Sequence, residues 1–173
     1  MVLRIILWIL IGSSVMFCQA HKPVSLATYP PAIGYVSDYS GLLEDAASAE
    51  LNSLLSGYAD STSTQIFIAI LDSLENDQSL NEAAVRIFEE WKPGTIELNN
   101  GVLFLILPRL RVMRLEIGYG LEKVLTDKRC EFILDSLVTP RFSEKDFHGG
   151  ILAAVQQIKT HLDMDWQPVM QEE

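Results

Sequence analysis

An uncharged apolar run in the middle of the chain constrains the fold more than any other feature. Every residue from Val102 to Leu107 is aliphatic or aromatic, and Asn99-Asn100-Gly101 stands directly before the run. A short apolar run bounded by turn residues is typical of a strand buried on both faces. Because a lone strand or hairpin is not stable in water, Val102–Leu107 is predicted to be a central strand with a partner on each side.

The flanking segments predict how this strand pairs. Gln65 to Leu71 is a second uncharged apolar segment, and a helix predicted from Leu80 to Trp91 links it to the central strand. A strand, helix and strand of these lengths form a right-handed crossover, so the two strands are predicted to be parallel neighbours. The connection after the central strand is too short for another crossover, so Arg111–Ile117 is predicted to return antiparallel. Arg114 and Glu116 then lie on the wetter face of an edge strand.

The N-terminus has the pattern of a secretory leader. Arg4 precedes an apolar run from Ile5 to Phe17, and small residues stand at Cys18 and Ala20, where a signal peptidase cleaves. We expect cleavage after Ala20 and a secreted or periplasmic protein with no transmembrane segment after the leader. A retained membrane anchor is the alternative, although this run of 13 residues is shorter than the roughly 20 that cross a bilayer. Lipid attachment at Cys18 is a weaker alternative, because the residues before it are not small.

The rest of the chain predicts an arm, three amphipathic helices and a tail. Pro23, Pro30 and Pro31 indicate an extended arm, and folding is expected to begin near Gly34. Apolar residues recur at helical spacing over residues 44–58, within 127–138 and over 147–162. The expected organisation is a signal peptide over residues 1–20, a Pro-rich arm over 21–34, one α/β domain over 35–166 and a short polar tail over 167–173.

Charge and cysteine content exclude several functions. The whole chain has a net charge of −10 at pH 7, and loss of the leader removes Arg4 and brings the charge to −11. So acidic a chain has no electrostatic footprint for nucleic acid or anionic lipid, and it favours cations or basic surfaces. Without Cys18, Cys130 is the only thiol, so an intramolecular disulfide cannot form and Cys130 is expected to be a buried small residue.

The hairpin predicts where polar groups gather. If the central strand and its return are antiparallel, Gly118-Tyr119-Gly120 ends beside Asn99 and Asn100, with Glu122 and Asp127 close behind. The two glycines allow positive φ and close backbone approach. Amide, carboxylate and main-chain oxygens are the ligands that Ca²⁺ prefers, so this edge is a candidate calcium site. Ordinary turn chemistry is the competing interpretation, because Asn-Gly and Gly-x-Gly form turns and Asp127 can cap a helix.

Motifs spread over nearly the whole mature chain carry a family resemblance. They are Val36-Ser37-Asp38-Tyr39-Ser40-Gly41-Leu42-Leu43, Trp91 before a turn, Asn99-Asn100-Gly101-Val102-Leu103, Arg114-Leu115-Glu116-Ile117-Gly118-Tyr119-Gly120-Leu121-Glu122, Leu125-Thr126-Asp127, and Pro140-Arg141-Phe142 with Asp146-Phe147. In this order they resemble the TPM domain family, from about Tyr35 to Leu162. The resemblance implies a three-layer α/β/α sandwich with a small mixed sheet, exported to the periplasm, the thylakoid lumen or the cell exterior.

The resemblance also implies candidate functions. Members of the family are described as acid phosphatases, as factors in photosystem repair and as accessory subunits of a membrane receptor, with divalent cations, notably calcium, bound at an acidic groove. Carried over residue by residue, the metal ligands implied here are Asp38, Asn99, Asn100, Glu122 and Asp127.

Two functions of different classes therefore stand as hypotheses. The first is a calcium-binding accessory module that contacts another exported or membrane protein. The second is a metal-dependent acid phosphatase that hydrolyses phosphomonoesters, in which the cation polarises a phosphoryl oxygen and Asp38 or Asp127 positions water. A phosphatase also needs positive groups, and only Arg114 and Lys123 are near the predicted edge. No Ser or Cys stands in a nucleophile elbow, so the binding module is preferred.

Overall fold

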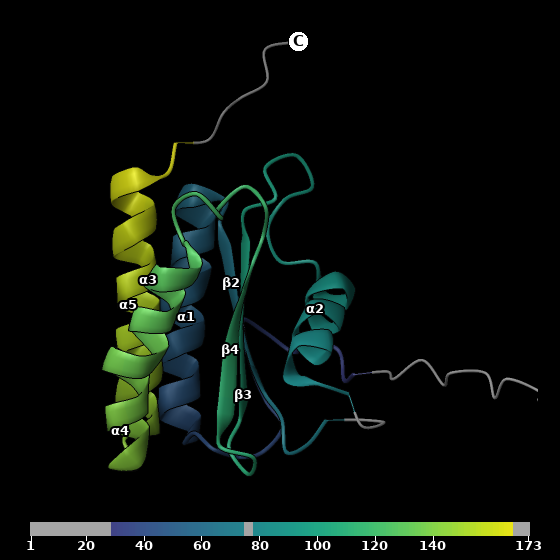
Figure 1. Cartoon of the computed structure of the whole chain (residues 1–173), viewed down its shortest axis with the longest axis vertical. Helices are drawn as coiled ribbons and strands as arrows, with labels where there is room; N and C mark the ends of the chain where they lie inside the picture. Colours follow the sequence, from purple (N-terminus) through teal and green to yellow (C-terminus); the bar gives the residue numbers. More distant parts are fainter. Residues whose placement is uncertain (1–28, 75–77, 168–173) are drawn as a thin grey trace, which may run out of the picture.

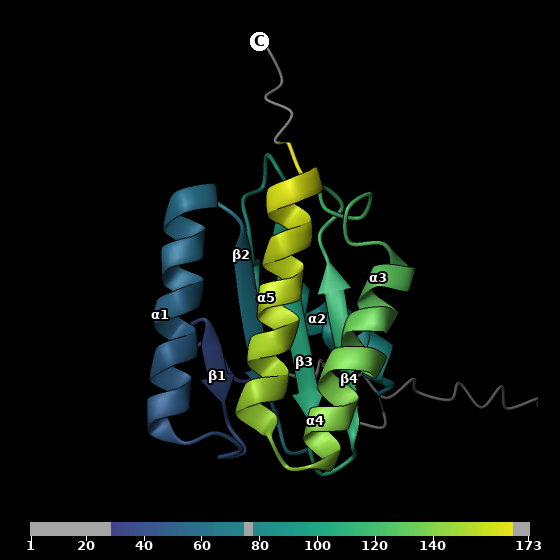
Figure 2. The ribbon, with the colours of Figure 1, turned by 90° about the vertical axis from the view of Figure 1, so that its left-hand side faces the viewer.

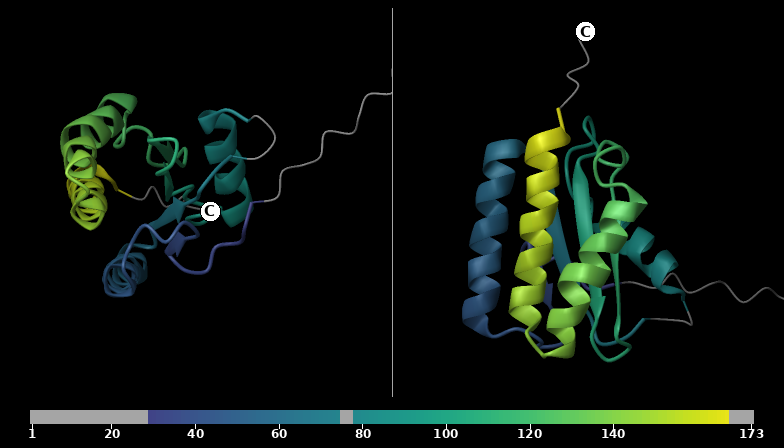
Figure 3. Two further views of the ribbon diagram at one scale, coloured as in Figure 1. Left: turned by 90° about the horizontal axis from the view of Figure 1, so that it is seen from below. Right: turned by 60° about the vertical axis from the view of Figure 1, so that its left-hand side comes forward.

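A computed structural model describes residues 29–74 and 78–167 as a layered α/β structure (Figure 1). One four-stranded sheet has the order β1-β2-β3-β4. Seen from below, helix α2 lies on one side of the sheet and the other helices lie on the opposite side (Figure 3). The mixed α/β fold predicted from the sequence is confirmed. The strands are β1 (Val36–Asp38), β2 (Gln65–Ile70), β3 (Gly101–Leu107) and β4 (Val112–Ile117).

The sheet has the predicted pairing. Strand β2 is parallel to β3 through the register Ile66 to Val102, and β3 is antiparallel to β4 through Phe104 to Leu115. The predicted central strand is therefore confirmed, and every residue of β3 is buried. The short β1 lies parallel to β2 at the other edge. As a result β4 is an edge strand, with only β3 beside it in the sheet.

The two faces of β3 explain its uninterrupted apolar composition. Val102, Phe104 and Ile106 belong to a core shared with the larger group of helices. The alternate residues Leu103, Leu105 and Leu107 face a second core with Ala83, Ala84 and Ile87 of α2. A strand covered on both sides has no position for a polar side chain, because each would be buried without water.

The helices match the predicted periodicity but not always the predicted ends. They are α1 (Asp45–Thr62), α2 (Leu80–Trp91), α3 (Asp127–Phe132), the π-helical η1 (Ile133–Val138), α4 (Thr139–Ser143) and α5 (Phe147–Asp165). The end of α1 was predicted too early: the helix continues through Gly57 to Thr62 and ends where Ser63 is left-handed and its N–H donates to the Ala59 carbonyl. Figure 2 shows α1, α5 and the continuous α3, η1 and α4 segment lying side by side over the sheet.

The described part of the arm packs on the fold. Tyr29 is buried with the α2 core, and the Trp91 indole N–H donates to the Pro30 carbonyl at 3.0 Å. The predicted leader, the start of the arm and most of the predicted tail lie outside the described residues. None of the described helices combines the length and the apolar character needed to cross a membrane.

Candidate functional site

The predicted meeting of the two glycines and the two asparagines is present. The Gly118 N–H donates to the Gly101 carbonyl at 2.9 Å, and the Gly120 N–H donates to the Asn99 carbonyl at 3.1 Å. The loop before β3 and the loop after β4 therefore lie together at one end of the strands, which forms the upper edge of the sheet in Figure 2.

The glycines serve close approach alone. A Cβ at Gly118 would overlap the Asn99 carbonyl oxygen, and a Cβ at Gly120 would overlap the Leu98 carbonyl oxygen. Neither glycine has a positive φ; in the loop before β3 the left-handed conformation is adopted by Gly94, with φ of 86°, and by Asn99, with φ of 47°. The expectation that these glycines provide positive φ was wrong. Glycine is needed at both positions for another reason: a carbonyl oxygen of the loop before β3 packs so close to the Cα that no Cβ fits.

Asn100 is part of the scaffold beneath this edge. Its side chain is fully buried. The Asn100 Oδ1 accepts from the Thr95 N–H at 2.9 Å, and Nδ2 donates to Ser63 Oγ at 3.1 Å and to Thr64 Oγ1 at 3.4 Å. These bonds join the loop before β3 to the end of α1. An amide enclosed in this way offers no oxygen to a ligand in the groove.

Asp38 lies at the opposite end of the strands, which forms the lower edge of the sheet in Figure 2. It ends β1 and is paired with Ile70 at the end of β2, whereas Asn100 directly precedes Gly101, which starts β3 and is paired with Gln65 at the start of β2. Its carboxylate accepts from the N–H groups of Ser40 at 3.0 Å and Leu43 at 2.8 Å, and so it shapes the loop into α1. The structure therefore does not bring Asp38 together with the other candidate ligands.

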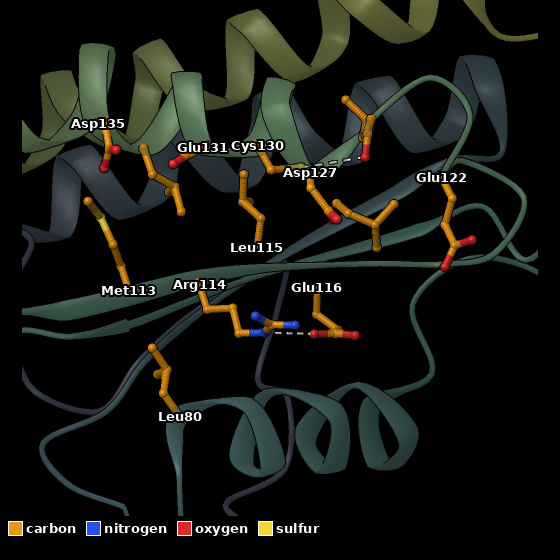
Figure 4. Close-up of a pocket in the computed structure, with 13 residues that line it drawn as sticks. Leu80, Met113, Arg114, Leu115, Glu116, Glu122, Asp127, Cys130, Glu131 and Asp135 are labelled. Carbon is orange, nitrogen blue, oxygen red and sulfur yellow. Dashed lines mark hydrogen bonds and ion pairs between the residues drawn. The ribbon is translucent and has the colours of Figure 1, made fainter.

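Glu122 and Asp127 contribute to an acidic groove along β4. The groove has a volume of about 800 Å³ and lies between the outer side of β4, the start of α2 at Leu80, and the continuous α3 and η1 helices (Figure 4). We call it the β4 groove. Its charged lining consists of five carboxylates and one guanidinium: Glu116, Glu122, Asp127, Glu131, Asp135 and Arg114.

The single guanidinium of the lining is already paired. Arg114 Nε lies 2.9 Å from Glu116 Oε2, and both side chains are partly buried on the α2 side of the strand. Among residues 29–74 and 78–167, none forms an ion pair with the other four carboxylates. The groove therefore has an uncompensated negative charge.

Sequence reasoning missed three of these carboxylates. Glu131 and Asp135 follow Asp127 at intervals of four residues, so the three side chains form one stripe along α3 and η1. That spacing could have been found in the sequence. Glu116 was placed correctly on β4 but was not connected with the site.

A smaller cavity of about 390 Å³ lies next to the β4 groove. It is bounded by the end of α2 and the loop after β4, and Asn99 and Glu122 both line it. Glu122 lines both spaces and Asp127 lines the β4 groove alone. Among the described residues, no three His, Cys, Asp or Glu side chains are grouped closely enough to hold a metal ion. A cation at this edge would depend on Glu122 and Asp127 together with amide and main-chain oxygens.

Cys130 lines the β4 groove, and we predict it to be unreactive. Burial is the main cause that raises the pKa of its thiol from 9.0 to about 11, and the charge of Asp127 adds to the shift. A shift of two units lowers the thiolate fraction at pH 8 by about 100-fold. Iodoacetamide should therefore alkylate Cys130 about 100-fold more slowly than the cysteine of an unstructured peptide. Equal rates, followed by mass spectrometry, would refute this environment for the thiol.

The motifs at these loops belong to a known family. The sequence matches the TPM domain over residues 36–161. This chain belongs to the TPM domain family. No curated protein matches it.

Solved structures share the fold of this TPM domain. The solution NMR structure of the N-terminal domain of a protein from P. gingivalis is similar with a TM-score of 0.69 and 26% identity, over 80% of this chain and 88% of that one. The N-terminal domain of the cg2496 protein from Corynebacterium glutamicum has a TM-score of 0.58 and 16% identity, over 86% and 93%. The BA42 protein from the psychrophilic Bizionia argentinensis has a TM-score of 0.64 and 16% identity, over 78% and 90%.

Proposed function

We propose that this TPM domain is an exported binding module that takes up a divalent cation, calcium, at the β4 groove and contacts another exported or membrane protein. The observation that carries the proposal is the exposed, unpaired carboxylates of the groove, among them Glu122 and Asp127. Clustered carboxylates repel one another, and a divalent cation relieves that repulsion.

The donor set fits a weak calcium site. Calcium takes six to eight oxygens, and the side-chain candidates in the β4 groove are the carboxylates of Glu122 and Asp127. Asn99 lines the adjoining cavity, which Glu122 also lines, so its side-chain oxygen could join only a cation held on the Glu122 side. Main-chain carbonyls and water would supply the remaining ligands. So few charged ligands place the expected affinity in the millimolar range typical of extracellular modules.

Phosphatase activity is less compatible with the groove. A phosphomonoester carries negative charge, and its transition state needs positive groups beside it. Here Arg114 is the only guanidinium in the lining, and Glu116 already neutralises it at 2.9 Å. Such a groove attracts cations and repels phosphate. We expect no hydrolysis of p-nitrophenyl phosphate above the buffer rate, with or without calcium.

A calcium titration tests the proposed function. With a dissociation constant of about 1 mM, 10 mM calcium stabilises the protein by about 1.4 kcal/mol, which raises Tm by roughly 3–6 °C. Glu122→Gln and Asp127→Asn should each reduce this rise while leaving Tm in EDTA nearly unchanged. Asp60→Asn is the matched control, because it removes one exposed carboxylate from α1, away from the groove. The absence of both a Tm rise and chemical-shift changes at Glu122 and Asp127 would overturn the cation site.

A further inference from the structure

The outer edge of β4 has unpaired backbone groups. The Gly118 N–H bonds to β3 through Gly101, and in an antiparallel pair every second residue exchanges bonds with the same neighbour. Glu116, Arg114 and Val112 therefore bond to β3. The N–H and C=O groups of Met113, Leu115 and Ile117 point away from the sheet, and no other described residue bonds to them.

The β4 groove runs along this open edge. Its lining includes every residue from Met113 to Ile117 on the strand side, and the helical wall opposite is formed by α3 and η1 (Figure 4). Five residues of strand span about 17 Å at 3.4 Å per residue. A trough of this kind, with a strand edge on one side and a helix on the other, has the shape and the hydrogen-bonding groups to accept one extended peptide segment.

The acidic stripe on the helical wall matches the repeat of an extended segment. Asp127, Glu131 and Asp135 are four residues apart, which corresponds to about 6 Å along the helix axis. Side chains on one face of a strand repeat at about 6.7 Å. Alternate side chains of an added strand can therefore each meet one carboxylate. Between them, Cys130 and Leu134 provide an apolar floor.

We propose that β4 binds an extended segment of a partner protein as a fifth strand, with lysine or arginine at alternate positions facing Asp127, Glu131 and Asp135. This inference rests on the partner-binding half of the proposed function and is independent of the calcium half. A second copy of this chain is a poorer occupant, because two acidic grooves would meet and the chain has a net charge of −10. The same charges limit unselective pairing at the exposed strand edge.

The test uses a synthetic peptide and amide hydrogen exchange. The probe is an eight-residue peptide of alternating valine and lysine, blocked at both ends and added in EDTA. Binding should slow exchange at the amides of Met113, Leu115 and Ile117 by roughly tenfold or more. The amides of Val112, Arg114 and Glu116 are internal controls, because β3 protects them with or without peptide. Working in EDTA separates this result from the calcium titration.

Two control peptides and a set of variants separate strand addition from simple charge attraction. A peptide of alternating valine and glutamate should not bind. The valine and lysine peptide should also fail to bind when the backbone N–H groups that would face β4 are methylated, because strand addition needs those donors. Glu131→Gln and Asp135→Asn should each weaken binding about 2- to 5-fold, whereas Asp60→Asn should leave it unchanged.

Three results would overturn the inference. The first is no binding of the valine and lysine peptide. The second is binding without protection of the three outward amides, or equal binding of the N-methylated peptide. The third is protection that rises with protein concentration in the absence of peptide, which would identify a second copy as the occupant.

Discussion

Replacing Gly120 with alanine is expected to destabilise the protein by about 3 kcal/mol and to lower Tm by roughly 6–12 °C. The new Cβ would overlap the Leu98 carbonyl oxygen. Because that neighbour is backbone, it cannot turn aside as a flexible side chain would, and the two loops at this edge must separate. Thermal unfolding followed by circular dichroism measures the effect.

Two substitutions serve as controls for this prediction. Tyr119 stands next to Gly120 but is 82% exposed, so Tyr119→Ala should change stability by less than about 0.5 kcal/mol. Gly57→Ala adds a Cβ into open space in the interior of α1, and it should stabilise the protein by about 1 kcal/mol. A Gly120→Ala protein with the Tm of the unsubstituted chain would show that the loops do not approach as described.

Asn100→Ala is expected to destabilise the protein by about 2–4 kcal/mol, equally in calcium and in EDTA. The substitution leaves the partly buried Thr95 N–H without its acceptor and removes the donor shared by Ser63 and Thr64. Urea unfolding in both buffers measures the loss and its dependence on the cation.

The neighbouring asparagine is the control for Asn100. Asn99 is exposed and has φ of 47°, so Asn99→Gly keeps the backbone conformation and should change stability by less than about 0.5 kcal/mol. If the loss in Asn100→Ala occurred only in calcium, Asn100 would be a cation ligand and its scaffold role would be refuted.

The site residues show how far sequence reasoning reached. The hairpin of β3 and β4 correctly predicted that the Asn99 and Gly118 loops meet, since antiparallel pairing joins the end of one strand to the start of the other. It could not predict that Asn100 turns inward, because the direction of one side chain depends on the packing of α1 beneath it. Asp38 was grouped with this edge through a motif, but the parallel direction of β1 places it at the opposite edge.

The sequence by itself determined the elements whose signals are local. The uncharged run of β3 predicted a strand covered on both faces. The apolar spacing of α2 predicted its bounds, and a capping box between Ser79 and Glu82 defines its start in the structure. Such features are encoded within a few neighbouring residues, through hydrophobic periodicity and the hydrogen bonds of the first helical turn.

Only the tertiary structure decided what the β4 groove contains. Its walls come from β4 and from the α3 and η1 segment, and its acidic character arises because the stripe from Asp127 to Asp135 faces the open strand edge. Neither the rotation of a helix about its axis nor the free side of a strand is a local property. Both follow from how the helices cover the larger core, where apolar burial outweighs the repulsion between the carboxylates that it brings together.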